Sequence, residues 1–128
     1  MTRREIEVMP AGTYLSRQVA ERFMGWRVVK VKAEHATVLW ERGDQRAGAC
    51  EDCGDEPTPR AYSTSNEAAL ELLPVFAARG WDLNIHPLFD GGCDVTARQV
   101  SSGLTLSMSA SSVAGVLSRT ALLTTEIA

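Results

Sequence analysis

The apolar residues recur at helical spacing in three stretches of the chain. In residues 13–26 the apolar positions fall at i, i+4 and i+8, and they are Leu15, Val19 and Phe23. This spacing predicts an amphipathic helix. Gly25 is expected to end it, because glycine readily takes the left-handed conformation at a helix C-terminus and an apolar residue often follows. Trp26 is that apolar residue.

A second helix is predicted after residue 64, where Thr64 and Glu67 form an S/T-x-x-E capping box. Pro74 predicts a kink, because proline lacks an amide donor and clashes with the preceding turn. The helix is expected to stop at a second Gly-Trp pair, Gly80 and Trp81. The residues expected on its apolar side are Ala69, Leu70, Leu73, Phe76 and Ala77.

A third helix is predicted from a serine cap at about Ser111. The residues expected to face inward from it are Val113, Val116, Leu117 and Thr120.

Alternation of apolar and polar residues predicts strands in the remaining segments. Residues 27–33 and 37–41 are expected to form a hairpin, and the runs 81–89, 93–100 and 104–109 to form a meander. Residues 42–61 lack periodicity and predict a long irregular loop. The expected fold is α+β: one domain over residues 1–128, a layered α-β-α sandwich of order α-β-β-α-β-β-β-α with a mainly antiparallel sheet.

Length and charge limit the classes of function. A chain of 128 residues can bury a sizeable core, so no cofactor is required for stability. No apolar run approaches the roughly 20 residues that span a bilayer, which predicts a protein without membrane segments. Residues 1–34 carry a net charge of +3 and the remainder −6, a balance that disfavours binding to duplex nucleic acid. The helix–three strands–helix order of residues 66–124 matches double-stranded-RNA-binding domains, but its final helix offers only Arg119 as a cation.

The cysteines raise the question of a metal. Cys50 and Cys53 have the C-x-x-C spacing that can hold zinc, yet a closed zinc site needs two further ligands. The residues that could supply them are Cys93, His35 and His86. Without a second C-x-x-C pair, we expect reduced thiols and no bound metal. Catalytic signatures such as GxSxG, HExxH and a phosphate-binding glycine loop are absent, so we expect no enzymatic activity.

One segment predicts an anion-binding site. The start of the helix after Thr64 offers backbone amides and hydroxyl groups, Arg60 offers a guanidinium, and Tyr62 offers a stacking surface. Arg98, or Lys30 and Lys32, are expected to add positive charge. The alternative is a purely structural helix cap with a packed tyrosine. The complete set of expected ligand-binding residues is Arg60, Tyr62, Ser63, Thr64, Ser65, Arg98, Lys30 and Lys32.

Three sequence blocks carry a resemblance to a known family. Residues 19–26, VAERFMGW, are similar to an AEKVMGW block; Pro59 with Tyr62-Ser63-Thr64 is similar to a PxYSTD block; and residues 112–122 are similar to a closing helix. In these blocks the chain resembles small phage proteins with the phage ABA-sandwich domain. Ser65 departs from the aspartate usual in that family, and the strand region matches weakly. The resemblance implies an α-β-α sandwich and a viral origin.

The resemblance and the predicted anion site together suggest a function. We expect a phage-encoded, non-enzymatic protein that acts in the host cytoplasm as a sponge, sequestering a nucleotide-derived, cyclic nucleotide-type immune signal. A homo-oligomer is expected, because a chain this short has little surface with which to enclose a ligand alone. The alternative is a phage protein that binds a host protein or virion component through a surface patch.

Overall fold

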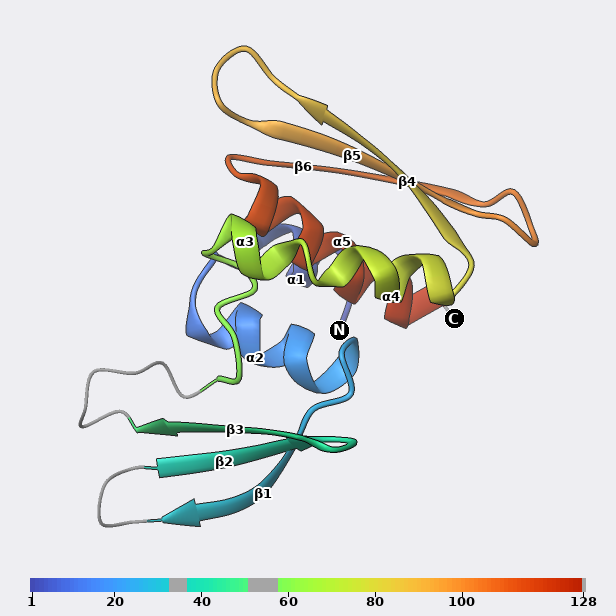
Figure 1. Ribbon diagram of the computed structural model, residues 1–128. Coiled ribbons are helices and arrows are strands. Elements are labelled where there is room, and N and C mark those ends of the chain that lie inside the picture. The colour runs from blue at the N-terminus through green and yellow to red at the C-terminus, as the bar shows by residue number, and fades with distance from the viewer. Residues whose placement is uncertain (33–36, 51–57, 128) are drawn as a thin grey trace.

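The protein has two small antiparallel sheets with its helices between them (Figure 1). The computed structural model describes residues 1–32, 37–50 and 58–127. One sheet has the order β1-β2-β3 and the other β4-β5-β6. The helices are α1 (Arg3–Val8), α2 (Thr13–Arg22), α3 (Asn66–Ala69), α4 (Leu72–Ala78) and α5 (Val113–Ile127). The strands are β1 (Arg27–Lys32), β2 (Thr37–Arg42), β3 (Gln45–Cys50), β4 (Trp81–Pro87), β5 (Cys93–Gln99) and β6 (Thr105–Ala110).

This architecture confirms the α+β class and corrects the predicted order. The sequence prediction lacked α1 and β3. The helices lie between two sheets, instead of covering both faces of one sheet (Figure 1). The signal for α1 was present in the sequence, because Thr2 is an N-cap whose hydroxyl accepts from the Glu5 amide at 3.2 Å.

Strand β3 occupies part of the segment predicted to be irregular. It pairs with β2 from Thr37 opposite Cys50 to Arg42 opposite Gln45. Only Gly43 and Asp44 separate the two strands, and Gly43 has a φ of +56°. A two-residue turn containing glycine is a strong hairpin signal, because such turns need positive φ to match the strand twist. The signal was masked by the weakly apolar composition of β3.

The predicted second helix is two short helices, and its cap lies one residue later than expected. Ser65, not Thr64, is the N-cap of α3, with its hydroxyl accepting from the Ala68 amide at 3.2 Å. The helical path breaks at Leu70 and Glu71 instead of kinking at Pro74. The break places Pro74 in the first turn of α4, where its missing amide leaves no hydrogen bond unmade. Leu70, expected inside, is therefore 52% exposed. Ala77, expected on the same apolar side, is exposed as well.

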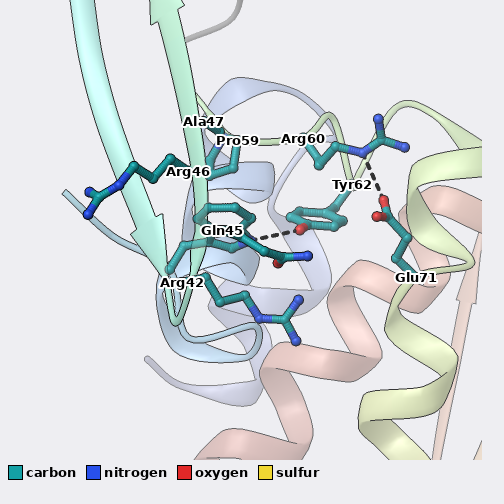
Figure 2. Close-up of a pocket in the computed structure, with 9 residues that line it drawn as sticks. Arg42, Gln45, Arg46, Ala47, Pro59, Arg60, Tyr62 and Glu71 are labelled. Atoms are coloured by element: carbon teal, nitrogen blue, oxygen red, sulfur yellow. Dashed lines mark hydrogen bonds and ion pairs between the residues drawn. The ribbon is translucent and has the colours of Figure 1, made fainter. Parts of the chain in front are cut away.

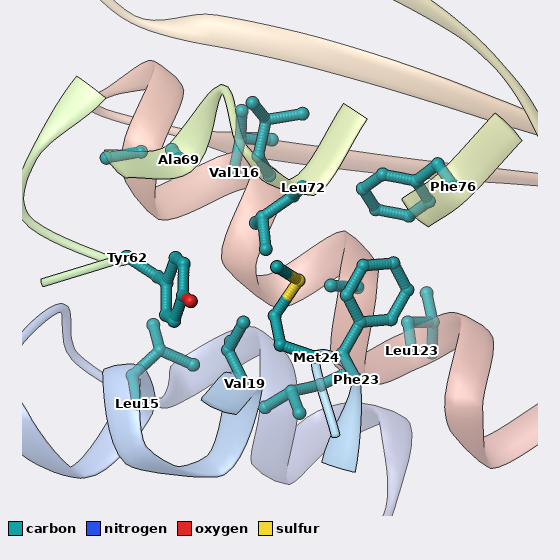
Figure 3. Close-up of a cluster of buried hydrophobic side chains, with 14 of the residues drawn as sticks. Leu15, Val19, Phe23, Met24, Tyr62, Ala69, Leu72, Phe76, Val116 and Leu123 are labelled. Carbon is teal, nitrogen blue, oxygen red and sulfur yellow. The ribbon is translucent and has the colours of Figure 1, made fainter. Parts of the chain in front are cut away.

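The main core lies between α2, α5 and the α3–α4 segment (Figure 3). The predicted apolar stripe of α2 is confirmed, since Leu15, Val19 and Phe23 are all fully buried. Phe23 meets Phe76 of α4 with ring centroids 4.7 Å apart. From α5, Val116 and Leu117 are also fully buried, as predicted. These contacts hold the helical layer to which both sheets attach.

Both Gly-Trp pairs end helices, as predicted. Gly25 has a φ of +81°, and beyond it the Trp26 amide donates to the Ala20 carbonyl at 2.9 Å. Gly80 has a φ of +83°, and Trp81 then starts β4. Each tryptophan is at most 8% exposed, so the two junctions serve packing.

Candidate functional site

An open pocket of about 450 Å³ lies where the β2–β3 hairpin meets the segment before α3 (Figure 2). Its position joins parts of the chain that are far apart in sequence. The residues that line it are Trp26, Arg42, Gln45, Arg46, Ala47, Pro59, Arg60, Tyr62 and Glu71. Polar and charged groups predominate in this set, which is typical of a site for a charged ligand.

Strand alternation decides which arginines of the hairpin face this pocket. Arg42 pairs with Gln45 at the end of the hairpin, and both side chains extend toward Tyr62 (Figure 2). Arg46 points to the opposite side of the sheet, where its guanidinium contacts Glu41 at 2.7 Å. Gln45 and Arg46 are successive residues of β3, and successive side chains of a strand lie on opposite faces of the sheet. Arg42 is therefore the cation that the hairpin contributes.

Glu41 on that outer face is shared by two arginines. Arg27 donates to one of its carboxylate oxygens and Arg46 to the other. The hydrogen bond from Arg27 is the largest cause of the lowered pKa of Glu41; burial opposes it, and the charges of both arginines add to the lowering. These arginines are thus occupied by a carboxylate outside the pocket.

Arg60 lies on the other side of the pocket and pairs with Glu71. Its Nε donates to Glu71 Oε2 at 2.8 Å, and both side chains are about half exposed. Exposed pairs of this kind contribute little to stability, so a competing anion can displace one partner at low cost. Within the described ranges, no carboxylate forms an ion pair with Arg42. Arg42 and Arg60 against Glu71 leave the pocket with an excess of positive charge.

Tyr62 is one of the residues that line the pocket. The Tyr62 side chain is only 1% exposed, and its ring packs among core residues near Leu15 and Val19 (Figure 3). Its oxygen accepts from Trp26 Nε1 at 3.1 Å. Among the described residues, no acceptor receives the hydroxyl proton of Tyr62, which leaves that proton for a ligand. The expected stacking surface is wrong, because a ring this buried cannot receive a base.

The pKa of the Tyr62 hydroxyl differs between the folded and the unfolded protein. Burial raises the pKa of Tyr62, and this effect outweighs the opposing hydrogen bond from Trp26. Because the pKa of Tyr62 is raised in the folded protein, the neutral tyrosine contributes to stability at pH values below about 10, the ordinary pKa of tyrosine. That stabilisation is lost as the pH rises through the folded-state value.

We expect an alkaline transition specific to Tyr62. In a Tyr14→Phe variant Tyr62 is the one remaining tyrosine, since the chain has 2. Tyrosinate absorbance of this variant should rise at a higher pH in buffer than in strong denaturant. A midpoint in buffer at or below the denatured value would contradict the burial of the hydroxyl.

Ser63 is a structural residue of the predicted block. It is fully buried, and its Oγ accepts from the Gly12 amide, donates to the Gly12 carbonyl and contacts Ser16 Oγ at 2.8 Å. The Ser63 amide donates to Ser16 Oγ at 3.0 Å. Every hydrogen-bonding position of this hydroxyl is therefore used within the protein. Thr64 is exposed, and Ser65 caps α3.

Of the remaining predicted cations, Arg98 does not line this pocket. Arg98 lies on β5, in the sheet on the far side of the helical layer, and its nearest acid is Asp82 at 3.8 Å (Figure 1). Lys30 and Lys32 belong to β1, where they pair with Leu39 and Thr37. The side chains of both lysines lie outside the described residues. Among the predicted residues whose side chains are described, Arg60 and Tyr62 alone line the pocket.

The structure adds no support for a zinc site. Cys53 and His35, with the side chain of Cys50, lie outside the described residues. Cys93 is buried at the start of β5, and burial raises the pKa of its thiol. In the described part of the chain, no group of three or more His, Cys, Asp or Glu residues is placed to hold a metal ion.

Arg42, Gln45 and Glu71 are pocket residues that the sequence analysis missed. The available signal was the Gly43–Asp44 turn, which would have placed Arg42 and Gln45 opposite each other on one face. No comparable signal existed for Glu71, since its position depends on the break between α3 and α4.

Comparison of the chain with protein-family models, with curated proteins and with solved structures finds no match. In the ranges described above, none of the helices combines the length and apolar character needed to cross a membrane.

Proposed function

We propose that the protein is a phage-encoded binding protein that holds a small nucleotide-derived immune signal of the host without converting it. The observation that supports this proposal is that Arg42, Arg60 and Tyr62, whose hydroxyl proton has no acceptor among the described residues, line one pocket. Guanidinium groups and hydroxyl protons are the donors that phosphate oxygens favour, because charge-assisted hydrogen bonds are about twice as strong as neutral ones.

The size of the pocket suits one phosphorylated moiety. Its volume of about 450 Å³ falls within the ~300–1,000 Å³ of ligand pockets in general. Trp26, Ala47 and Pro59 supply only a small apolar part of the lining. We therefore expect contacts with phosphate to contribute most of the affinity, and base stacking to contribute little.

The same proposal includes assembly and location. One chain leaves the pocket open to solvent, and a second copy would exclude water from a bound ligand. We propose a homo-oligomer acting in the host cytoplasm. Light scattering that gives the mass of a single chain, both with and without ligand, would argue against the oligomer.

The direct test is to identify what the protein carries. Protein purified from phage-infected cells is heated, and the released small molecules are analysed by mass spectrometry. We expect a phosphorylated, nucleotide-derived compound. Release of no such compound, together with no binding of phosphate monoesters by the purified protein, would overturn the proposal.

One observation favours the second candidate, a phage protein that binds a host protein or virion component through a surface patch. Phe89 is fully exposed at the turn between β4 and β5, beside the 41% exposed Leu88. The turn is held by hydrogen bonds from Leu88 to Gly92 and from Gly92 to Asp90. Exposed aromatic anchors are typical of protein interfaces. Loss of a specifically retained protein on Phe89→Ser, with ligand binding unchanged, would favour this candidate.

A further inference from the structure

Glu71 is an unusual member of a pocket that is otherwise cationic. It occupies the N-cap position of α4, yet its side chain makes no capping hydrogen bond. Its carboxylate turns to the pocket instead, where Oε2 accepts from Arg60 Nε at 2.8 Å. Among the described residues, no donor contacts the other oxygen, Oε1. The carboxylate of Glu71 thus offers a free acceptor beside Arg60 (Figure 2).

The carboxylate of Glu71 disfavours binding of a simple anion in the pocket. A bound phosphate near Glu71 would be repelled, because like charges disfavour each other. The repulsion is offset if the ligand itself donates a hydrogen bond to the carboxylate. The amide of Gln45, on the hairpin side of the same pocket, can accept a further donor.

We propose that Glu71 is a specificity-determining residue that selects a phosphate ester whose sugar carries free hydroxyl groups. This inference rests on the proposed function, because it assumes that phosphate binds at Arg42 and Arg60. It adds that the ligand is a sugar phosphate, such as the ribose phosphate part of a nucleotide, in which a hydroxyl donates to Glu71 Oε1. Phosphate monoesters without such a donor bind more weakly because of the same carboxylate.

The experiment compares two phosphate monoesters that differ in this donor. Methyl phosphate carries no hydroxyl group on its methyl group, whereas the sugar of ribose phosphate carries several. The indole N–H resonance of Trp26 reports binding by NMR titration, since Trp26 Nε1 contacts the Tyr62 hydroxyl in the pocket. We expect wild-type protein to prefer ribose phosphate by about tenfold or more, as for a hydrogen bond to a charged group.

Glu71→Gln should change this preference in a defined direction. Removal of the negative charge should strengthen binding of methyl phosphate and bring the affinities of the two esters to within about threefold of each other. Glu67→Gln is the matched control, because Glu67 is an exposed acid on α3 that does not line the pocket. It should leave the preference of the wild type unchanged.

The outcomes separate the inference from the proposed function. Equal affinity of the wild type for both esters, or a preference that survives Glu71→Gln, overturns the role of Glu71 and leaves phosphate binding intact. Failure of wild-type protein to bind either ester overturns both. A preference that Glu71→Gln abolishes and Glu67→Gln retains supports the inference.

Discussion

Replacement of Arg42 by glutamine is expected to weaken binding of ribose phosphate by roughly 10- to 150-fold. The change removes one charge-assisted contact, and such contacts contribute about 1.5–3 kcal/mol. Arg42 has no ion-pair partner in the described part of the chain, so the substitution breaks no ion pair recorded there. NMR titration of the Trp26 indole gives the affinity. Thermal melting of the same sample is expected to change little.

Arg27→Gln is the matched control for this variant. Arg27 lies on β1 of the same sheet and carries the same charge, but its guanidinium contacts Glu41 on the outer face and it does not line the pocket. Its replacement should leave the affinity within about threefold of wild type, because a distant charge is screened in salt. Equal losses in both variants would show that the general charge of the sheet attracts the ligand, and would remove the pocket as its site.

The parts of the fold that could be predicted are those that local patterning determines. The i, i+4, i+8 spacing of Leu15, Val19 and Phe23 specifies the buried face of α2 without reference to any other element. Gly25 ends that helix for an equally local reason, since its φ of +81° is costly for other residues. Where neighbouring residues decide the conformation, the prediction was confirmed.

The pocket could not be predicted because it depends on long-range pairing. Arg42 and Arg60 line the same pocket only through the hairpin that β3 completes and through the burial of Tyr62 in the core. A strand as weakly apolar as β3 has little signal in its own residues, and its turn was the only local indication. The burial of Tyr62 could not be predicted either, because a tyrosine before a helix cap can pack inward or face solvent.

The error at the helix cap has a similar origin. Thr64 and Glu67 satisfy the capping-box pattern, but Ser65 can cap as well, and two candidate caps in sequence are nearly equivalent locally. The burial of Ser63 in contact with Gly12 and Ser16 sets the path of the chain. With that path fixed, Ser65 is the residue that reaches the Ala68 amide.

Ser63→Ala is expected to destabilise the protein by about 2–5 kcal/mol. The hydroxyl of Ser63 forms hydrogen bonds with the amide and the carbonyl of Gly12 and with the hydroxyl of Ser16. These hydrogen bonds are buried or partly buried. Each buried polar group left without its partner costs about 1–3 kcal/mol. In a domain of this size the melting temperature should fall by on the order of 10 °C, measured by calorimetry or circular dichroism.

Thr64→Ala provides the control, since Thr64 is exposed and adjacent to the buried network. Its melting temperature should stay within about 2 °C of wild type, because surface substitutions usually change stability by less than 0.5 kcal/mol. Below its melting temperature, Ser63→Ala should bind ribose phosphate like wild type, because its hydroxyl faces Gly12 and Ser16 and does not line the pocket. A Ser63→Ala protein that melts normally but loses affinity would contradict this assignment, and would return the Tyr-Ser-Thr block to the ligand site.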